Sequence, residues 1–194
     1  DFVVEPKFDG LTVVLTYRDG VLEQGATRGN GEIGDDVTPN VRTVRSIPLR
    51  IPVNPREPAP PGRLIVRGEV LFLKKDFEKL NERQISEGLP PYANPRNTAS
   101  GALKQKDARI TASRPLNAFC YSIVDADSDV PDTQWETLQY LKALGFQIAD
   151  DVARRFDTLD ETIEYIESFH SRRHDLPYET DGLVIKVNSH AIYE

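Results

Sequence analysis

Charged side chains alternate near the beginning of the chain, where Glu5, Lys7 and Asp9 stand in the stretch Glu-Pro-Lys-Phe-Asp-Gly. The apolar residues before them predict a short β-strand, in which residues two apart point to the same face. A lysine amine held between two carboxylates is either a nucleophile with assisting groups or part of a structural ion-pair network. Spacing alone favours the network, because such networks also gather charges in this way.

A glycine-rich loop carries the next candidate, Arg28, in the sequence Arg-Gly-Asn-Gly. It follows a predicted β-hairpin whose strands cover residues 11–18 and 21–28, with Asp-Gly at the turn between them. Exposed backbone N–H groups and a guanidinium suit an anion. A tight turn would explain the same glycines without any ligand.

Two charged residues interrupt apolar strands further along the chain. Glu69 lies within a predicted strand over residues 63–73, and Lys186 lies within another over residues 181–187. A carboxylate inside an apolar strand is costly unless it is paired or solvated at a cleft. Glu69 is therefore either a site residue or a salt-bridged structural acid.

A predicted helix presents two further cations, Arg96 and Lys104. Asn94 can cap this helix and Pro95 suits its first position. Because the two cations are eight residues apart, about two helical turns, they share one face. The small residues between them allow close approach of a ligand.

The remaining pattern predicts a helix over residues 74–87, a strand over 116–124 and two helices that begin after Thr133 and Thr158 with capping boxes. His170 and His174 are one helical turn apart and could in principle bind a metal. The sequence offers no evident third ligand and places two arginines between them, which favours a solvated helix end. From its residues alone, the chain is predicted to be an α+β domain with an anion-binding lysine cleft.

Composition limits the class of protein. The chain has 194 residues, 39% of them hydrophobic and 28% charged, which is typical of a globular protein. No apolar run approaches the length of a membrane span. A net charge of −7 argues mildly against a nucleic-acid partner, although residues 61–115 hold eleven basic against six acidic residues and could face phosphates. The absence of methionine and the start at Asp1 lead us to expect a fragment of a longer protein.

Four motifs in order carry a family resemblance: Lys7-Phe-Asp-Gly10, Arg28 in its glycine loop, Arg67-Gly-Glu69, and Asp181-Gly-Leu-Val-Ile-Lys186. Together they resemble the covalent nucleotidyltransferases, which comprise DNA ligases, RNA ligases and mRNA capping enzymes. Further stretches are similar to the bacterial NAD-dependent DNA ligases, namely Gly25-Ala-Thr-Arg-Gly-Asn-Gly31, Asn40-Val-Arg-Thr-Val-Arg-Ser-Ile-Pro-Leu49, Ala93-Asn-Pro-Arg-Asn97 and Arg109-Ile-Thr-Ala-Ser-Arg-Pro115.

The resemblance implies a fold and a domain plan. The fold would have antiparallel sheets with flanking helices, as in the ligase and capping-enzyme (ATP-grasp-like) nucleotidyltransferases. Residues 1–194 would be the core of an adenylation domain, without the upstream domain that binds nicotinamide mononucleotide. The downstream OB-fold, zinc, helix-hairpin-helix and C-terminal modules would also be absent. We expect a monomer in the bacterial cytoplasm, associated with the nucleoid and with no membrane contact.

The resemblance also implies a reaction. Lys7 would attack the adenylyl phosphorus of NAD and form lysyl-AMP; AMP would pass to the 5′-phosphate of nicked double-stranded DNA, and the 3′-hydroxyl would seal the nick. Glu5 and Lys186 would address the adenine, while Arg28 and Glu69 would hold the ribose and phosphate side. Asp9 would be a catalytic residue beside Lys7.

Metal and DNA contacts follow from the same resemblance. Asp9 and Glu69 would hold the water shell of Mg²⁺ or Mn²⁺, and zinc would occur only in the downstream modules. Arg96 and Lys104 would contact DNA or phosphate. Lys104 stands where the family usually has arginine, so a bidentate phosphate contact would become a point charge.

Other readings of the sequence stay open. Asn30 stands where the family usually has aspartate. An ATP-dependent ligase or a capping-type enzyme would share the lysine chemistry, but would not be expected to carry Ala93-Asn-Pro-Arg-Asn97. A catalytically inactive nucleotide- or DNA-binding module is the alternative from another class. We expect the 194-residue chain alone neither to react with NAD nor to seal nicks.

Overall fold

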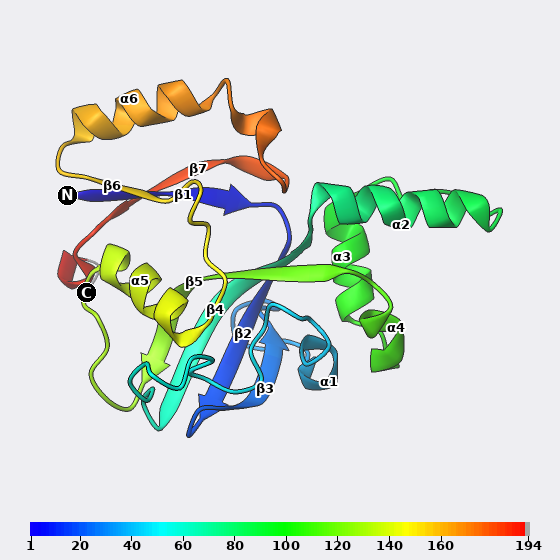
Figure 1. Cartoon of the computed structure of the whole chain (residues 1–194), viewed down its shortest axis with the longest axis horizontal. Helices are drawn as coiled ribbons and strands as arrows, with labels where there is room; N and C mark the ends of the chain where they lie inside the picture. Colours follow the sequence, from blue (N-terminus) through cyan, green and yellow to red (C-terminus); the bar gives the residue numbers. More distant parts are fainter. Residues whose placement is uncertain (193–194) are drawn as a thin grey trace.

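Two antiparallel sheets form the frame of the computed structural model, which describes residues 1–192 (Figure 1). The first sheet has the order β6-β1-β7, with β1 at Phe2–Phe8, β6 at Arg154–Phe156 and β7 at Thr180–Val187. The second has the order β3-β2-β4-β5, with β2 at Leu11–Arg18, β3 at Val21–Thr27, β4 at Arg63–Phe72 and β5 at Leu116–Ala126. The predicted α+β class with antiparallel sheets is confirmed.

The chain passes from the first sheet to the second through Asp9 and Gly10, between the end of β1 and the start of β2. A Cβ atom on Gly10 would lie 2.4 Å from the carbonyl oxygen of Val70 in β4. Only glycine allows this approach of two backbones, so the Asp-Gly pair fixes the point at which the sheets join.

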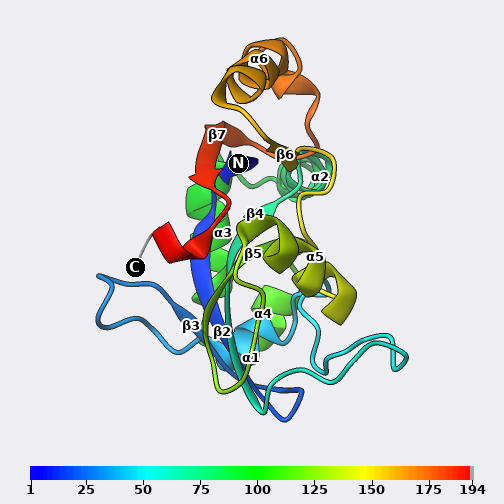
Figure 2. The same ribbon diagram turned by 90° about the vertical axis from the view of Figure 1, so that its left-hand side faces the viewer.

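Helices flank the sheets. The helix α3 packs on β4, α5 packs on β5, and α6 lies over β1 and β6. Figure 2 shows α6 at one end of the molecule and the β2–β3 turn at the other. The α-helices are α1 Thr38–Val41, α2 Lys74–Ser86, α3 Pro95–Leu103, α4 Ala108–Ala112, α5 Gln134–Leu144 and α6 Leu159–Phe169, with 3₁₀ turns η1 at Arg173–Asp175 and η2 at His190–Ile192.

Local signals in the sequence set several helix ends. The side chains of Thr133 and Thr158 each accept an N–H three residues on, as the capping boxes predict. Gly145 ends α5 with φ of 109°, a left-handed conformation that glycine adopts without strain. The apolar spacing of Leu159, Ile163, Ile166 and Phe169 predicts an inward face for α6. Leu159 and Ile163 are 49% and 43% exposed, so this prediction is wrong at these two positions.

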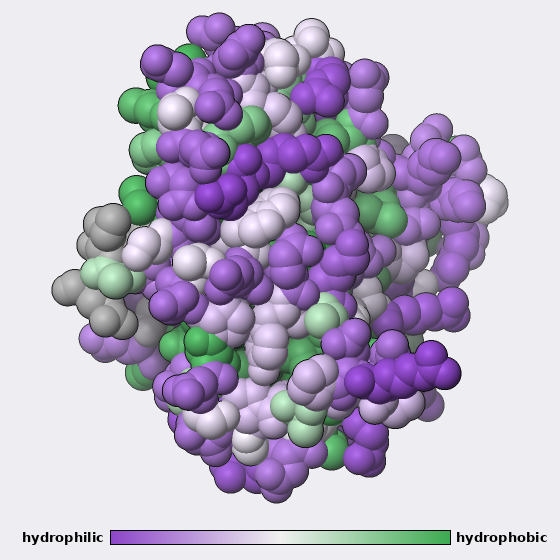
Figure 3. All heavy atoms as spheres, turned by 60° about the vertical axis from the view of Figure 1, so that its left-hand side comes forward, coloured by the Kyte–Doolittle hydropathy of each residue, from purple (hydrophilic) through white to green (hydrophobic). Residues whose placement is uncertain are grey.

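The main core lies between the second sheet and the helices that cover it. A smaller cluster of Leu71, Phe119, Ala149 and Tyr178 lies where the sheets meet, with Phe8 packed against it. The face in Figure 3 is mostly hydrophilic, with apolar residues in small separate groups. Within residues 1–192 no helix combines the length and apolar character needed to cross a bilayer.

Candidate active site

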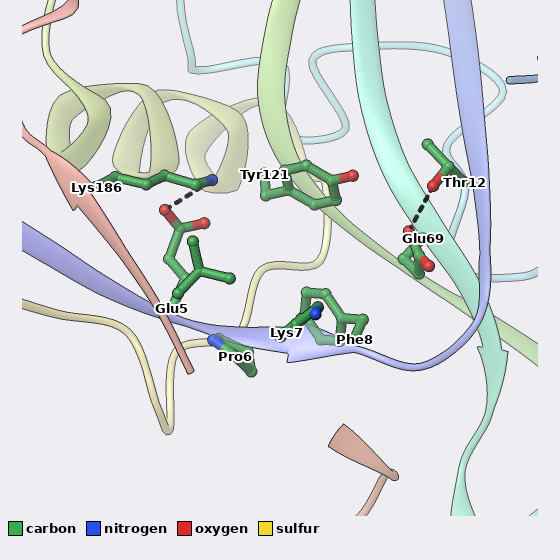
Figure 4. A pocket seen from close by; sticks show the side chains of 9 residues that line it. Glu5, Pro6, Lys7, Phe8, Thr12, Glu69, Tyr121 and Lys186 are labelled. Carbon is green, nitrogen blue, oxygen red and sulfur yellow. Dashed lines mark hydrogen bonds and ion pairs between the residues drawn. The ribbon is translucent and has the colours of Figure 1, made fainter. Parts of the chain in front are cut away.

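A cavity of about 250 Å³ lies between the two sheets, with the side chain of Lys7 exposed at its wall (Figure 4). The strands β1 and β7 line it from the first sheet, and β2, β4 and β5 line it from the second. Its lining residues are Glu5, Pro6, Lys7, Phe8, Thr12, Glu69, Tyr121, Val184 and Lys186. The structure therefore brings together four of the predicted site residues: Glu5, Lys7, Glu69 and Lys186.

An aromatic cluster fixes the strand end that carries Lys7. The ring of Phe8 stacks on Phe119 of β5 with centroids 5.1 Å apart and lies 5.4 Å from the ring of Tyr178. Phe119 and Tyr178 are themselves 4.9 Å apart. These contacts hold the partly buried Phe8, the residue next to Lys7, at the junction of the sheets, while the Lys7 side chain stays exposed at the cavity.

One wall of the cavity is an ion pair beside an aromatic ring. The carboxylate of Glu5 is 4% exposed, and its Oε2 lies 3.1 Å from Nζ of Lys186. The same Nζ lies 5.0 Å from the ring centroid of Tyr121, within the range of a cation–π contact. Burial raises the pKa of Tyr121 to about 12, so its hydroxyl stays protonated at neutral pH.

The structure does not form the Glu5–Lys7–Asp9 ion-pair network that spacing favours. Among the ion pairs of residues 1–192, Glu5 pairs with Lys186 and Asp9 with Arg96, and none includes Lys7. Strand β1 ends at Phe8, and its register with β7 shifts between Lys7 and Phe8. Asp9 therefore leaves the alternation of the strand and is not among the residues that line the cavity.

Glu69 is a buried carboxylate at the wall opposite Glu5. It is 8% exposed, and its Oε2 accepts a hydrogen bond of 3.0 Å from the hydroxyl of Thr12. The pKa of Glu69 is raised to about 7: burial is the largest cause and nearby Asp9 also raises it, while Thr12, Arg96 and the backbone of Gly10 lower it. Arg96 attracts Glu69 but forms its ion pair with Asp9, and no ion pair within residues 1–192 includes Glu69. The alternative of a salt-bridged structural acid is therefore wrong.

A second cavity of about 360 Å³ adjoins the first and shares Thr12 and Glu69 with it. Its walls carry Arg28, Arg96 and Lys104, the three cations predicted to contact phosphate. Arg28 comes from the loop after β3, whereas Arg96 and Lys104 come from α3 and the residue after it. The two cavities together place the amine of Lys7 beside a cavity whose three cations suit phosphate groups.

Comparison with known proteins decides the family. The sequence profile described as the NAD-dependent DNA ligase adenylation domain matches residues 1–194. The chain belongs to this family. It is 50% identical over 196 residues to a DNA ligase of Chloroflexus aurantiacus, covering 98% of this chain and 28% of that protein. It is 48% identical over 190 residues to a DNA ligase of Neisseria meningitidis serogroup C, covering 97% of this chain and 22% of that protein.

The chain thus spans about a quarter of the length of these relatives of the adenylation-domain family. A solved structure described as mycobacterial DNA ligase D complexed with ATP and MES has the same fold, with a TM-score of 0.51 at 13% identity. That match covers 97% of this chain and 48% of the other. The ligase nucleotidyltransferase fold predicted from the sequence is confirmed.

Two departures from the ligase adenylation-domain pattern have a structural account. Oδ1 of Asn30 accepts hydrogen bonds of 3.0 and 2.8 Å from the N–H groups of Glu32 and Ile33, which closes the loop after Arg28. An aspartate oxygen could accept the same two bonds, so asparagine keeps the turn. Lys104 follows the end of α3 and offers the second cavity one ammonium group in place of a planar fork.

Sequence reasoning did not single out Tyr121 or Gln134. Tyr121 lies on the predicted strand 116–124 and faces the cavity, but an aromatic residue in a strand is ordinary. Gln134 begins α5, where a polar residue is equally ordinary, yet it is buried and bonded to Glu5. The only pattern in the sequence that favours Tyr121 is its position two residues after Phe119, which puts its ring and hydroxyl on the same face of the strand.

The carboxylates near Lys7 can be tested against a divalent cation. Within residues 1–192, no three His, Cys, Asp or Glu side chains form a group that could hold a metal directly. Asp9 and Glu69 both have raised pKa values, because Asp9 is partly buried, Glu69 is buried and each has other carboxylates nearby. Two such oxygen donors fit a hydrated Mg²⁺, which keeps most of its waters and binds through one or two carboxylates and substrate phosphate.

Proposed function

We propose that residues 1–194 form the adenylation unit of a longer NAD-dependent DNA ligase, with Lys7 as the nucleophile. One observation carries the proposal. In a chain of the NAD-dependent adenylation-domain family, the amine of Lys7 is exposed at a cavity that it shares with Glu5, Glu69 and Lys186. Segments of the longer ligase outside these 194 residues would supply the grip on nicotinamide mononucleotide and the clamp on DNA.

In the first step, the neutral amine of Lys7 attacks the adenylyl phosphorus of NAD. The new bond joins Nζ to phosphorus, and the bond between that phosphorus and the bridging oxygen breaks. Nicotinamide mononucleotide leaves with the electron pair on its phosphate, and the lysine nitrogen loses one of its protons to solvent. Positioning and electrostatics supply most of the rate in phosphoryl transfer of this kind.

The side chains around Lys7 have distinct roles in this proposal. Glu5 and Lys186 address the edge of the adenine, and the ring of Tyr121 provides a flat surface beside it. Glu69, at the passage between the cavities, holds the ribose, and Arg28 holds the phosphate side in the second cavity. Asp9 assists as a catalytic carboxylate next to the nucleophile.

A divalent cation fits beside Asp9 and Glu69, which would hold its waters. When bound, Mg²⁺ or Mn²⁺ would neutralise charge on the phosphates during transfer. Lys186 remains paired with Glu5 on the far side of the cavity.

In the later steps, AMP passes from Lys7 to the 5′-phosphate of a DNA nick, and the 3′-hydroxyl displaces AMP to join the strands. Arg96 and Lys104 are suited to contact the DNA or its 5′-phosphate, because both line the second cavity. We propose that the ligase acts as a monomer in the bacterial cytoplasm, in contact with the nucleoid.

The test uses the full-length ligase with NAD and Mg²⁺, followed by intact mass spectrometry. The wild type should gain one adenylyl group, and Lys7→Ala should gain none, while Lys79→Ala, an exposed lysine of α2, should behave as wild type. Labelling by ATP in place of NAD would support the ATP-dependent alternative. Nick sealing that persists in Lys7→Ala would overturn the proposal.

The 194-residue chain alone should not gain mass with NAD, because the segment proposed to hold the nicotinamide end lies outside these residues. A mass increase of one adenylyl group on the chain alone would contradict this expectation.

A further inference from the structure

Gln134 is a buried amide that touches two walls of the Lys7 cavity. It is 5% exposed and begins α5, where its own N–H donates to the carbonyl oxygen of Asn188 at 2.7 Å. Its side-chain Nε2 donates to Oε2 of Glu5 at 2.9 Å and to the carbonyl oxygen of Tyr121 at 2.8 Å. Its Oε1 lies 3.2 Å from Nε2 of His190 in η2.

This bonding pattern fixes the orientation of the amide. Glu5 and the Tyr121 carbonyl can only accept hydrogen bonds, so the nitrogen of Gln134 must face them. The oxygen of Gln134 must then face His190, which requires a proton on Nε2 of that ring. This one orientation of the amide makes all three side-chain hydrogen bonds of Gln134. In the flipped orientation the amide oxygen would face two acceptors, the Glu5 carboxylate and the Tyr121 carbonyl, and could bond to neither.

The consequence falls on the carboxylate of Glu5. Its Oε2 is occupied by Gln134 and by the ammonium of Lys186, which lies 3.1 Å away. No hydrogen bond to Oε1 occurs among residues 1–192, and this oxygen points into the cavity in Figure 4. Gln134 and Lys186 together hold the carboxylate so that one acceptor oxygen is presented to a ligand.

We propose that Gln134 is a positioning residue that makes Glu5 selective for a purine carrying a 6-amino group. An exocyclic amine donates to a fixed acceptor oxygen, whereas a 6-oxo group facing that oxygen would leave both acceptors unpaired. A site built to accept a hydrogen bond discriminates strongly against a ligand that lacks the donor. This inference rests on the proposed function, because it requires NAD to be the substrate of the Lys7 cavity.

The test compares NAD with its 6-oxo analogue, nicotinamide hypoxanthine dinucleotide, as adenylyl donors for the full-length ligase. The measured quantity is the ratio of kcat/KM for the two donors, with nucleotidyl-lysine followed by intact mass. A variant that is merely destabilised loses activity with both donors and keeps the ratio. In Gln134→Met the preference for NAD should fall by about tenfold, the effect of one lost charge-assisted hydrogen bond.

Two further variants make the result interpretable. Gln139→Met is the matched control, because Gln139 is exposed on the same helix, and it should keep the wild-type ratio. His190→Ala removes the donor that faces Oε1 of Gln134 and should lower the preference by about threefold. It serves as the second variant if Gln134→Met does not fold.

The outcomes separate the two levels of the proposal. A wild-type ligase that takes no adenylyl group from NAD refutes the proposed function itself. A wild type that reacts equally well with both donors refutes the inference alone. So does a ratio that stays at the wild-type value in Gln134→Met and His190→Ala.

Discussion

Replacing Glu69 with glutamine should stabilise the chain at neutral pH. Burial holds the pKa of Glu69 at about 7, against an ordinary value of 4.5. Between pH 4.5 and pH 7 the folded protein binds more protons at Glu69 than the unfolded chain does. The free energy of unfolding therefore falls as the pH rises from 4.5 to 7, by up to about 3 kcal/mol from this group.

Glutamine removes this dependence and keeps an oxygen that can accept the hydrogen bond from Thr12. We expect Glu69→Gln to match the wild type near pH 4.5 and to exceed its unfolding free energy by about 2–3 kcal/mol at pH 8. Urea unfolding of the 194-residue chain, followed by the fluorescence of Trp135, measures this difference from pH 4.5 to 8.

Glu82→Gln serves as the control, because Glu82 is exposed on α2 and should change stability by less than about 0.5 kcal/mol at any pH. Parallel pH profiles for the wild type and Glu69→Gln would refute the reasoning. In the full-length ligase the same substitution should slow adenylation, since the proposed ribose contact is weakened while the fold is stabilised.

Two other substitutions test parts of the molecule outside the Lys7 cavity. Arg96→Ala should weaken binding of nicked DNA by the full-length ligase and make the slope of log affinity against log salt concentration less steep by about 1. Arg83→Ala, at an exposed position of α2, should leave this slope unchanged. Gly25→Ala should destabilise the chain by about 1–3 kcal/mol in urea unfolding, because its Cβ would lie 2.4 Å from Cγ2 of buried Val41. An unchanged slope in Arg96→Ala, or an unchanged unfolding midpoint in Gly25→Ala, would contradict these contacts.

Local sequence patterns were sufficient where the physical cause is local. Glu69 and Lys186 interrupt apolar strands, and this conflict between a charged residue and its apolar neighbours predicts both as site candidates from the sequence. Thr133 and Thr158 cap their helices as the capping boxes predict. These features depend on residues a few positions apart, so a sequence records them directly.

Other features depend on contacts that no local pattern contains. Gln134 bonds to Glu5 across 129 positions, and nothing near Gln134 marks that contact. Asp9 does not share the face of Glu5 and Lys7, because the register of β1 against β7 shifts between Lys7 and Phe8. This shift depends on the pairing of two distant strands. Ile163 is 43% exposed on α6, which lies over β1 and β6, and its helical spacing does not record how much of the helix the sheet covers.

The aromatic contact of Phe8 has a consequence for how the two sheets can move. The backbone of Phe8 is part of β1 in the first sheet, and its ring stacks on Phe119 of β5 in the second sheet. A rotation of one sheet against the other would therefore have its axis near Phe8, where displacement is smallest. Lys7 adjoins that axis, whereas the Glu5–Lys186 pair lies farther along the strand. In the proposed function, such a rotation would widen the cavity at the Glu5–Lys186 pair for exchange of substrate and product, while the Lys7 amine keeps its place.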